Sequence, residues 1–76
     1  MRDLLERLAK GLVDDPASVS VREIAGDEGI ALELRVAPDD LGKVIGRQGR
    51  TARSLRTILA AAGAKRGRRV ELEIVE

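Results

Sequence analysis

The 76-residue chain is expected to form one domain over residues 1–76, because domains typically run to ~100–150 residues, and its formal net charge is only +1. It contains no Cys, no His and no aromatic residue, which excludes thiolate metal sites, histidine bases and base stacking on aromatic rings. No apolar run reaches the ~20 residues of a membrane helix and no signal-peptide core is present, so we expect a cytoplasmic protein that acts away from membranes.

The N-terminal segment predicts an amphipathic helix. Leucines recur at helical spacing over about residues 2–13, which places Leu4, Leu8 and Leu12 in the expected core. The sequence Asp-Asp-Pro at 14–16 ends this helix, because the residue before a proline avoids the α region.

Two stretches of alternating residues predict a β-hairpin. Apolar and polar residues alternate over 18–22, and Ile24 falls out of phase, so we expect a bulge or an early strand end there. Residues 26–29 have the composition of a turn. Residues 30–36 then alternate cleanly, as expected for a half-buried strand.

The second half of the chain predicts two helices separated by a bend. Asp40 is a candidate N-cap for a short helix over 41–45. The sequence Gly-Arg-Gln-Gly at 46–49 interrupts the helical pattern. A longer helix is expected over 50–62, with Gly63 as its left-handed C-cap.

A last alternating stretch over 70–74 predicts a third strand and completes the order α-β-β-α-α-β. Three amphipathic strands can form one sheet with a single buried face. Three helices can cover that face, which predicts a two-layer α+β fold.

Positive charge is concentrated in one segment. Residues 1–40 hold five Lys and Arg against ten Asp and Glu, whereas residues 41–70 hold nine Lys and Arg and no acid. Clustered cations release counterions when they meet phosphates, so this segregation favours a polyanionic partner. A solvated helix face is the alternative interpretation, although such faces normally carry interleaved acids.

The bend at 46–49 carries the most informative pattern. Its glycines reach conformations closed to other residues and leave no Cβ in the way of a ligand. The amides that follow the bend, at the start of the second helix, are expected to be unpaired, and the helix dipole there favours an anion. Lys43, Arg47 and Arg50 add positive charge, so the segment is predicted to cradle phosphates.

The spacing of the glycines excludes the common nucleotide motifs. Val44 stands where a P-loop or a dinucleotide fingerprint requires its first glycine. The remaining match is the G-x-x-G loop of a KH domain, which clamps about four nucleotides of single-stranded nucleic acid. With this element order, the whole chain resembles a type II KH domain, and residues 37–52 are similar to the small stand-alone bacterial KH proteins of the KhpA family.

The resemblance implies a cytoplasmic bacterial RNA-binding protein that acts as an RNA chaperone or post-transcriptional regulator. It further implies a homodimer and a KhpB-type partner, itself a KH-domain protein, with roles in cell elongation and cell-wall homeostasis. Neither a nucleophile–base pair nor metal-ligand spacing is visible, so we expect neither an enzyme, a cofactor nor a metal.

We expect a strand of RNA to lie across the bend and along a groove whose walls are the two short helices and the strand 30–36. Arg47 and Gln48 would be exposed contacts, and one residue of the pair Val44 and Ile45 is expected in the core. The expected RNA-binding residues are Lys43, Val44, Ile45, Gly46, Arg47, Gln48, Gly49, Arg50 and Arg53.

Other interpretations stay open at this point. Two helices joined by a glycine-containing turn also resemble a helix-turn-helix reader of duplex DNA. A protein–protein dimerisation module would leave the cationic segment unexplained. The basic cluster at 65–69 either extends the positive surface or forms a solubilising loop.

Overall fold

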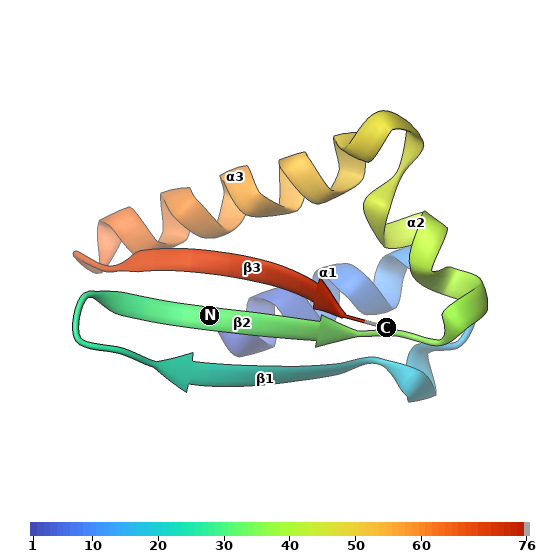
Figure 1. The fold of residues 1–76 in the computed structure, drawn as a ribbon, viewed down its shortest axis with the longest axis horizontal. Helices are drawn as coiled ribbons and strands as arrows, with labels where there is room; N and C mark the ends of the chain where they lie inside the picture. The colour runs from blue at the N-terminus through green and yellow to red at the C-terminus, as the bar shows by residue number, and fades with distance from the viewer. Residues whose placement is uncertain (76) are drawn as a thin grey trace.

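A computed structural model describes residues 1–75 and shows the three helices and three strands of the predicted order α-β-β-α-α-β (Figure 1). The helices are α1 (Arg2–Leu12), α2 (Leu41–Ile45) and α3 (Arg50–Lys65), and the strands are β1 (Ser20–Ala25), β2 (Gly29–Arg35) and β3 (Arg69–Val75). Short 3-10 helices at Pro16–Ser18, Pro38–Asp40 and Arg47–Gly49 precede β1, α2 and α3. None of the helices in this part of the chain has the length and apolar character needed to cross a bilayer.

The sheet is mixed, and β2 is its central strand. β1 pairs with β2 in antiparallel fashion through the expected hairpin. β3 pairs with the other edge of β2 in parallel fashion, which requires a crossover connection. The segment α2–bend–α3 supplies that crossover, and so the bend lies at the end of the molecule where β2 and β3 end (Figure 1).

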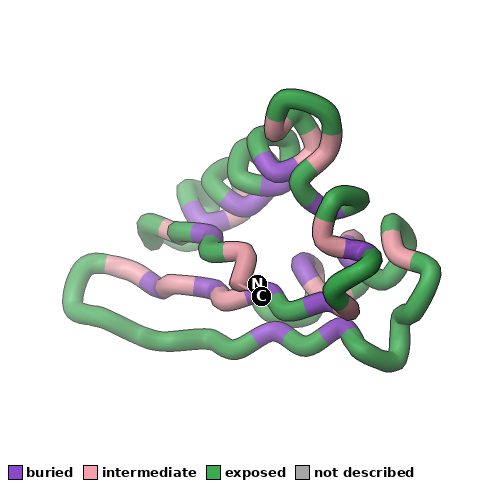
Figure 2. Tube along the Cα trace, turned by 45° about the vertical axis from the view of Figure 1, so that its right-hand side comes forward, coloured by how far each residue is buried: buried purple, intermediate pink, exposed green. Residues whose placement is uncertain are grey.

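One face of the sheet is apolar and is covered by the helices. Leu32 and Leu72 are register partners on this face, and α1 and α3 pack against it through residues such as Leu5 and Leu59. Burial concentrates where the helices face the sheet, whereas the bend is exposed or half-buried (Figure 2). This arrangement confirms the two-layer α+β fold.

The buried stripe of α1 differs from the predicted one by one residue. Leu5 and Ala9 are fully buried, whereas Leu4 and Leu8 are partly buried and Leu12 is 40% exposed. The leucine spacing identified the helix correctly. However, the face that meets the sheet is centred on Leu5 and Ala9, and Leu4 and Leu8 lie beside it. Leu12, the last residue of the helix, therefore projects from the core.

Two isoleucines, Ile24 and Ile58, lie outside the core and differ from what the sequence pattern predicted. Ile24 forms no bulge, because β1 pairs regularly as far as Ala25 and Ile24 stands opposite Ala31 on the open face of the sheet. Ile58 of α3 was expected on the buried face with Leu55 and is 42% exposed. Both side chains leave apolar surface in contact with solvent.

The sequence predicted Gly63 as the C-cap of α3, and this prediction is wrong. The helix continues to Lys65, and Gly63 is buried where a Cβ would come within 2.6 Å of the Val70 side chain. Gly67, with a φ of 69°, takes the left-handed conformation that turns the chain into β3. Gly63 is therefore required for close helix–strand packing.

Candidate nucleic-acid interface

The bend between α2 and α3 is built from positive-φ residues. Gly46 has φ 76° and ψ 170°, a combination that is essentially restricted to glycine. Gln48 and Gly49 both adopt the left-handed conformation, with φ of 57° and 73°. The chain therefore reverses within four residues, and Arg47 and Gln48 form the exposed tip.

The two glycines of the bend are needed for different reasons. A Cβ on Gly46 would come within 2.2 Å of Thr51 Oγ1 and 2.8 Å of the Thr51 backbone nitrogen. A Cβ on Gly49 would meet nothing within 4 Å. Gly46 is thus fixed by conformation and by packing on α3, whereas Gly49 is fixed by its conformation alone and faces open space.

Two unpaired amides lie within the bend, before the helix start where the sequence analysis placed them. The amides at the start of α3 were expected to be available, but that of Arg50 donates to the Arg47 carbonyl, and that of Gly49 to the Gly46 carbonyl, because the bend closes as a 3-10 turn. Within the described residues, no acceptor takes the backbone N–H of Arg47 or of Gln48. The tip therefore offers two amides to a ligand.

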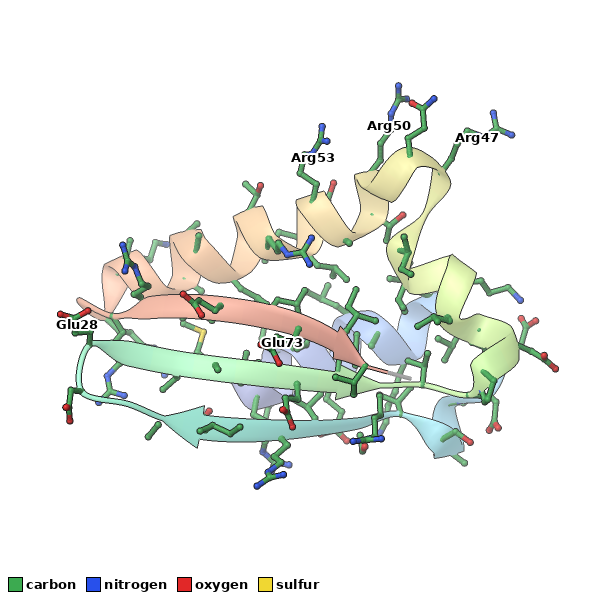
Figure 3. All side chains as sticks on the ribbon, viewed as in Figure 1. Glu28, Arg47, Arg50, Arg53 and Glu73 are labelled. Carbon is green, nitrogen blue, oxygen red and sulfur yellow. The ribbon has the colours of Figure 1, made fainter. Side chains whose placement is uncertain are left out.

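Three arginines lie at this tip and on the first turns of α3 beside it. Arg47, Arg50 and Arg53 are exposed, and their side chains point away from the sheet on the outer side of the bend and of α3 (Figure 3). No ion pair engages them within residues 1–75. The labelled acids Glu28 and Glu73 belong to the hairpin and to β3, away from this row (Figure 3).

Lys43 differs from these arginines, because its charge is already engaged. Its ammonium group forms an ion pair with the Asp14 carboxylate and lies 3.5 Å from Asp40 Oδ1. The hydrogen bond to Asp14 raises the pKa of Lys43 above its usual value. The structure therefore holds Lys43 against the body of the protein.

Asp40 occupies the predicted N-cap position of α2, but its side chain does not cap the helix. Its side chain makes no capping hydrogen bond to α2, and at 3% exposure it accepts the backbone N–H groups of Asp14 and Asp15. Burial pushes the pKa of Asp40 upward, but those two N–H groups and Lys43 outweigh it, so that the pKa is lowered. No local sequence signal connects residue 14 with residue 40.

Val44 and Ile45 separate as a core residue and a surface residue. Val44 is fully buried and belongs to the apolar core, whereas Ile45 is 37% exposed. Successive helical positions point about 100° apart, so one of the two had to face the sheet. Val44 is removed from the candidate interface for this reason.

The expectation that the strand 30–36 forms a wall of the groove is also wrong. β2 pairs with β1 on one edge and with β3 on the other, and its core-facing residues Leu32 and Leu34 are fully buried. Its backbone is therefore closed to a ligand. The strand that packs beside α3 at the edge of the sheet is β3.

The basic turn at 65–69 lies at the far end of α3 from the bend (Figure 1). Its four cations, Lys65, Arg66, Arg68 and Arg69, are exposed. α3 has 16 residues, so the turn and the bend are about 24 Å apart along the helix. Among these cations, Lys65 stands in the last turn of α3, where the helix dipole favours positive charge.

Comparison with known proteins identifies the family to which this bend belongs. A family profile described as "KhpA/KhpB, KH domain" matches residues 2–74. The chain belongs to this family of KH domains. The family is defined by a KH fold and is not enzymatic.

Three curated relatives have nearly the same length as this chain, and each is named "RNA-binding protein KhpA". The relative from Aquifex aeolicus is 57% identical over 76 residues, which cover all of this chain and 96% of the relative. The relative from Clostridium acetobutylicum is 53% identical over 75 residues, which cover 99% of this chain and all of the relative. The relative from Streptomyces coelicolor is 54% identical over 76 residues, which cover all of this chain and 95% of the relative.

Proposed function

We propose that this protein binds single-stranded RNA at the bend 46–49, where an RNA phosphate accepts the backbone N–H groups of Arg47 and Gln48. The observation that carries this proposal is a pair of amides on an exposed tip, beside arginines, for which residues 1–75 provide neither an acceptor nor an ion-pair partner. Two such amides beside cations favour an anion. The relatives named as RNA-binding proteins support RNA as the source of that anion.

The rest of the strand follows the outer side of α3. Arg50 and Arg53 are three residues apart and share one helix face, so they offer charge to successive phosphates. The exposed side chains of Ile45 and Ile58 offer apolar surface to bases, and the edge of β3 replaces β2 as the opposite wall. Because no aromatic residue can stack on a base, a single domain binds weakly and with little sequence preference.

The proposal for the wider role is supported by the family to which the chain belongs. We infer a cytoplasmic RNA chaperone or post-transcriptional regulator that works as a homodimer or with a KhpB-type partner in cell elongation and cell-wall homeostasis. The matching profile covers KH domains of both KhpA and KhpB, which supports the pairing. Two linked domains would raise the weak affinity of one through effective concentration.

The decisive experiment replaces Arg47 and Gln48 together with Asp. Asp tolerates the left-handed conformation of residue 48, so the bend keeps its shape while two carboxylates repel the phosphate. We expect RNA binding to be lost with an unchanged circular dichroism spectrum. A variant with Ala64→Asp and Arg66→Asp, which adds the same negative charge at the far end of α3, should retain binding to a short RNA.

Two results would contradict the proposal. RNA affinity unchanged in the Arg47→Asp, Gln48→Asp variant would remove the bend from the mechanism. Tighter binding of duplex DNA than of single-stranded RNA at equal salt would favour a helix-turn-helix function, although α2 has only five residues.

A further inference from the structure

A buried carboxylate ties the connection after α1 to the start of α2. Asp40 Oδ1 and Oδ2 accept the backbone N–H groups of Asp14 and Asp15 at 3.2 and 3.0 Å. Lys43 reaches the same place through its ion pair with the Asp14 carboxylate. These four residues, which we call the Asp40 clasp, join segments that lie at least 25 positions apart in the sequence.

α2 depends on such outside contacts for its orientation. With five residues it is far shorter than a helix that is stable through its own hydrogen bonds. It is held at its start by the clasp, in its last turn by the buried Val44, and at its end by Gly46 against Thr51. Because the bend follows α2 directly, any tilt of α2 moves the two amides at the tip.

The Asp40 clasp requires burial of a carboxylate, which costs more free energy than an apolar contact that would serve stability alone. A buried carboxylate loses hydration and is tolerated when hydrogen bonds and an opposite charge replace it. Asp40 directs both oxygens at the backbone of another segment, which fixes a position in space in a way that an apolar side chain does not. Within residues 1–75, Lys43 is also the one cation of the 41–70 segment that forms an ion pair.

We propose that Asp40 is a positioning residue for RNA binding and that Lys43 belongs to its clasp and is not a phosphate contact. The clasp holds α2 in the orientation that presents the amides of Arg47 and Gln48. This inference rests on the proposed function, since it concerns the same bend. It assigns to Lys43 a different role from the one that its position in the sequence predicted.

The direction in which Asp14→Asn changes RNA affinity distinguishes the two roles of Lys43, as a member of the clasp or as a phosphate contact. The Asp14 carboxylate is 82% exposed, so the substitution leaves no buried group unpaired and the variant should fold. Removing an acid and freeing Lys43 should tighten RNA binding if Lys43 were a phosphate contact, because the surface becomes more positive. The clasp predicts the reverse, a weaker complex.

The experiment measures fluorescence anisotropy of a labelled single-stranded RNA of about 12 nucleotides, longer than the about four nucleotides that a G-x-x-G loop clamps, against the full chain. Asp40→Asn, Asp14→Asn and a control, Val21→Ala, are compared at a temperature where each is fully folded. Val21 is a core residue of β1, the edge strand separated from β3 by β2, so its truncation lowers stability without touching α2. If the bend is correctly placed about one-fifth of the time without the clasp, Asp40→Asn weakens binding about 5-fold.

The expected pattern is weaker binding in both clasp variants and wild-type affinity in Val21→Ala at an equal or larger loss of thermal stability. Wild-type affinity in Asp40→Asn, or tighter binding in Asp14→Asn, would overturn the inference. If Asp40→Asn does not fold, the direction of the change in Asp14→Asn decides. Absence of RNA binding by the unaltered chain would instead refute the proposed function itself.

Lys43→Gln supplies an independent readout. A lost phosphate contact reduces the slope of log affinity against log salt by about 0.7 for a single strand. The clasp predicts weaker binding with an unchanged slope. A reduced slope would show that Lys43 contacts a phosphate and would overturn its assignment to the clasp.

Discussion

The side chain of Thr51 lies against the Cα of Gly46 so closely that no Cβ fits between them. Gly46 ends α2 and Thr51 is the second residue of α3. The two helices therefore meet where the Gly46 backbone lies against the side chain and the backbone nitrogen of Thr51. This contact sets the geometry of the bend and gives its two glycines unequal importance.

Replacing Gly46 with Ala should be much more damaging than replacing Gly49. Ala at 46 combines a φ/ψ strain of about 1–3 kcal/mol with overpacking against Thr51 of about 1–3 kcal/mol. Ala at 49 meets open space and bears only the left-handed penalty of about 1–2 kcal/mol. Urea denaturation of the two variants measures the difference, and equal losses of stability would contradict the packing described for Gly46.

Val44 and Ile45 should separate stability from binding. Truncating the fully buried Val44 to Ala removes core methyl groups and is expected to cost about 1–3 kcal/mol of unfolding free energy. Ile45→Ala should cost less but weaken RNA binding, because its exposed part is proposed to contact bases. Denaturation and anisotropy on both variants test this, and the reverse pattern would place Val44 at the interface.

RNA binding should depend steeply on salt. If about three to five phosphates are neutralised, log affinity should fall against log salt with a slope of about −2 to −3.5 for a single strand. Arg50→Gln should make the slope shallower by about 0.7, the share of one phosphate. Arg66→Gln, at the far end of α3, is the matched control and should leave the slope unchanged with a short RNA.

Acid should destabilise the protein partly through Asp40. Its pKa is lowered in the folded state because two backbone N–H groups and Lys43 outweigh the effect of burial. A lowered pKa contributes stability that is complete above the ordinary value of about 4 and is lost as the pH falls through the folded value. Thermal melting between neutral pH and pH ~3 should therefore show a steeper loss for the wild type than for Asp40→Asn.

Comparing the wild type with Asp40→Asn separates the contribution of Asp40 to the pH dependence of stability from that of the other acids. The Glu6 carboxylate also has a lowered pKa, through its hydrogen bond to Lys10, and it contributes equally in both proteins. Identical acid profiles for the wild type and Asp40→Asn would show that Asp40 is not charged and paired in the folded state.

Local patterns predicted much of this fold because local physics determines it. The alternation from Ile30 to Val36 identified β2, since a strand with one buried face has a period of two. The glycines at 46 and 49 identified the bend, since the positive φ that both adopt favours glycine. The exposure of Arg47 and Gln48 followed from the same pattern.

Long-range relationships could not be obtained in this way. Alternation shows that a strand has a buried face, but it does not show whether the strand is central, and so β2 was mistaken for the wall of a groove. The link between Asp14 and Asp40 joins distant residues, and each aspartate also fits a helix end. Val44 and Ile45 are adjacent β-branched residues, and only packing against the sheet distinguishes them.

The most direct test of the account is a titration of the isotope-labelled protein with single-stranded RNA, followed by amide NMR. If the tip amides bind a phosphate, the N–H signals of Arg47 and Gln48 should shift most, with smaller changes along Arg50 and Arg53. Large shifts confined to the open face of the sheet or to the basic turn at 65–69, with the bend unaffected, would contradict it.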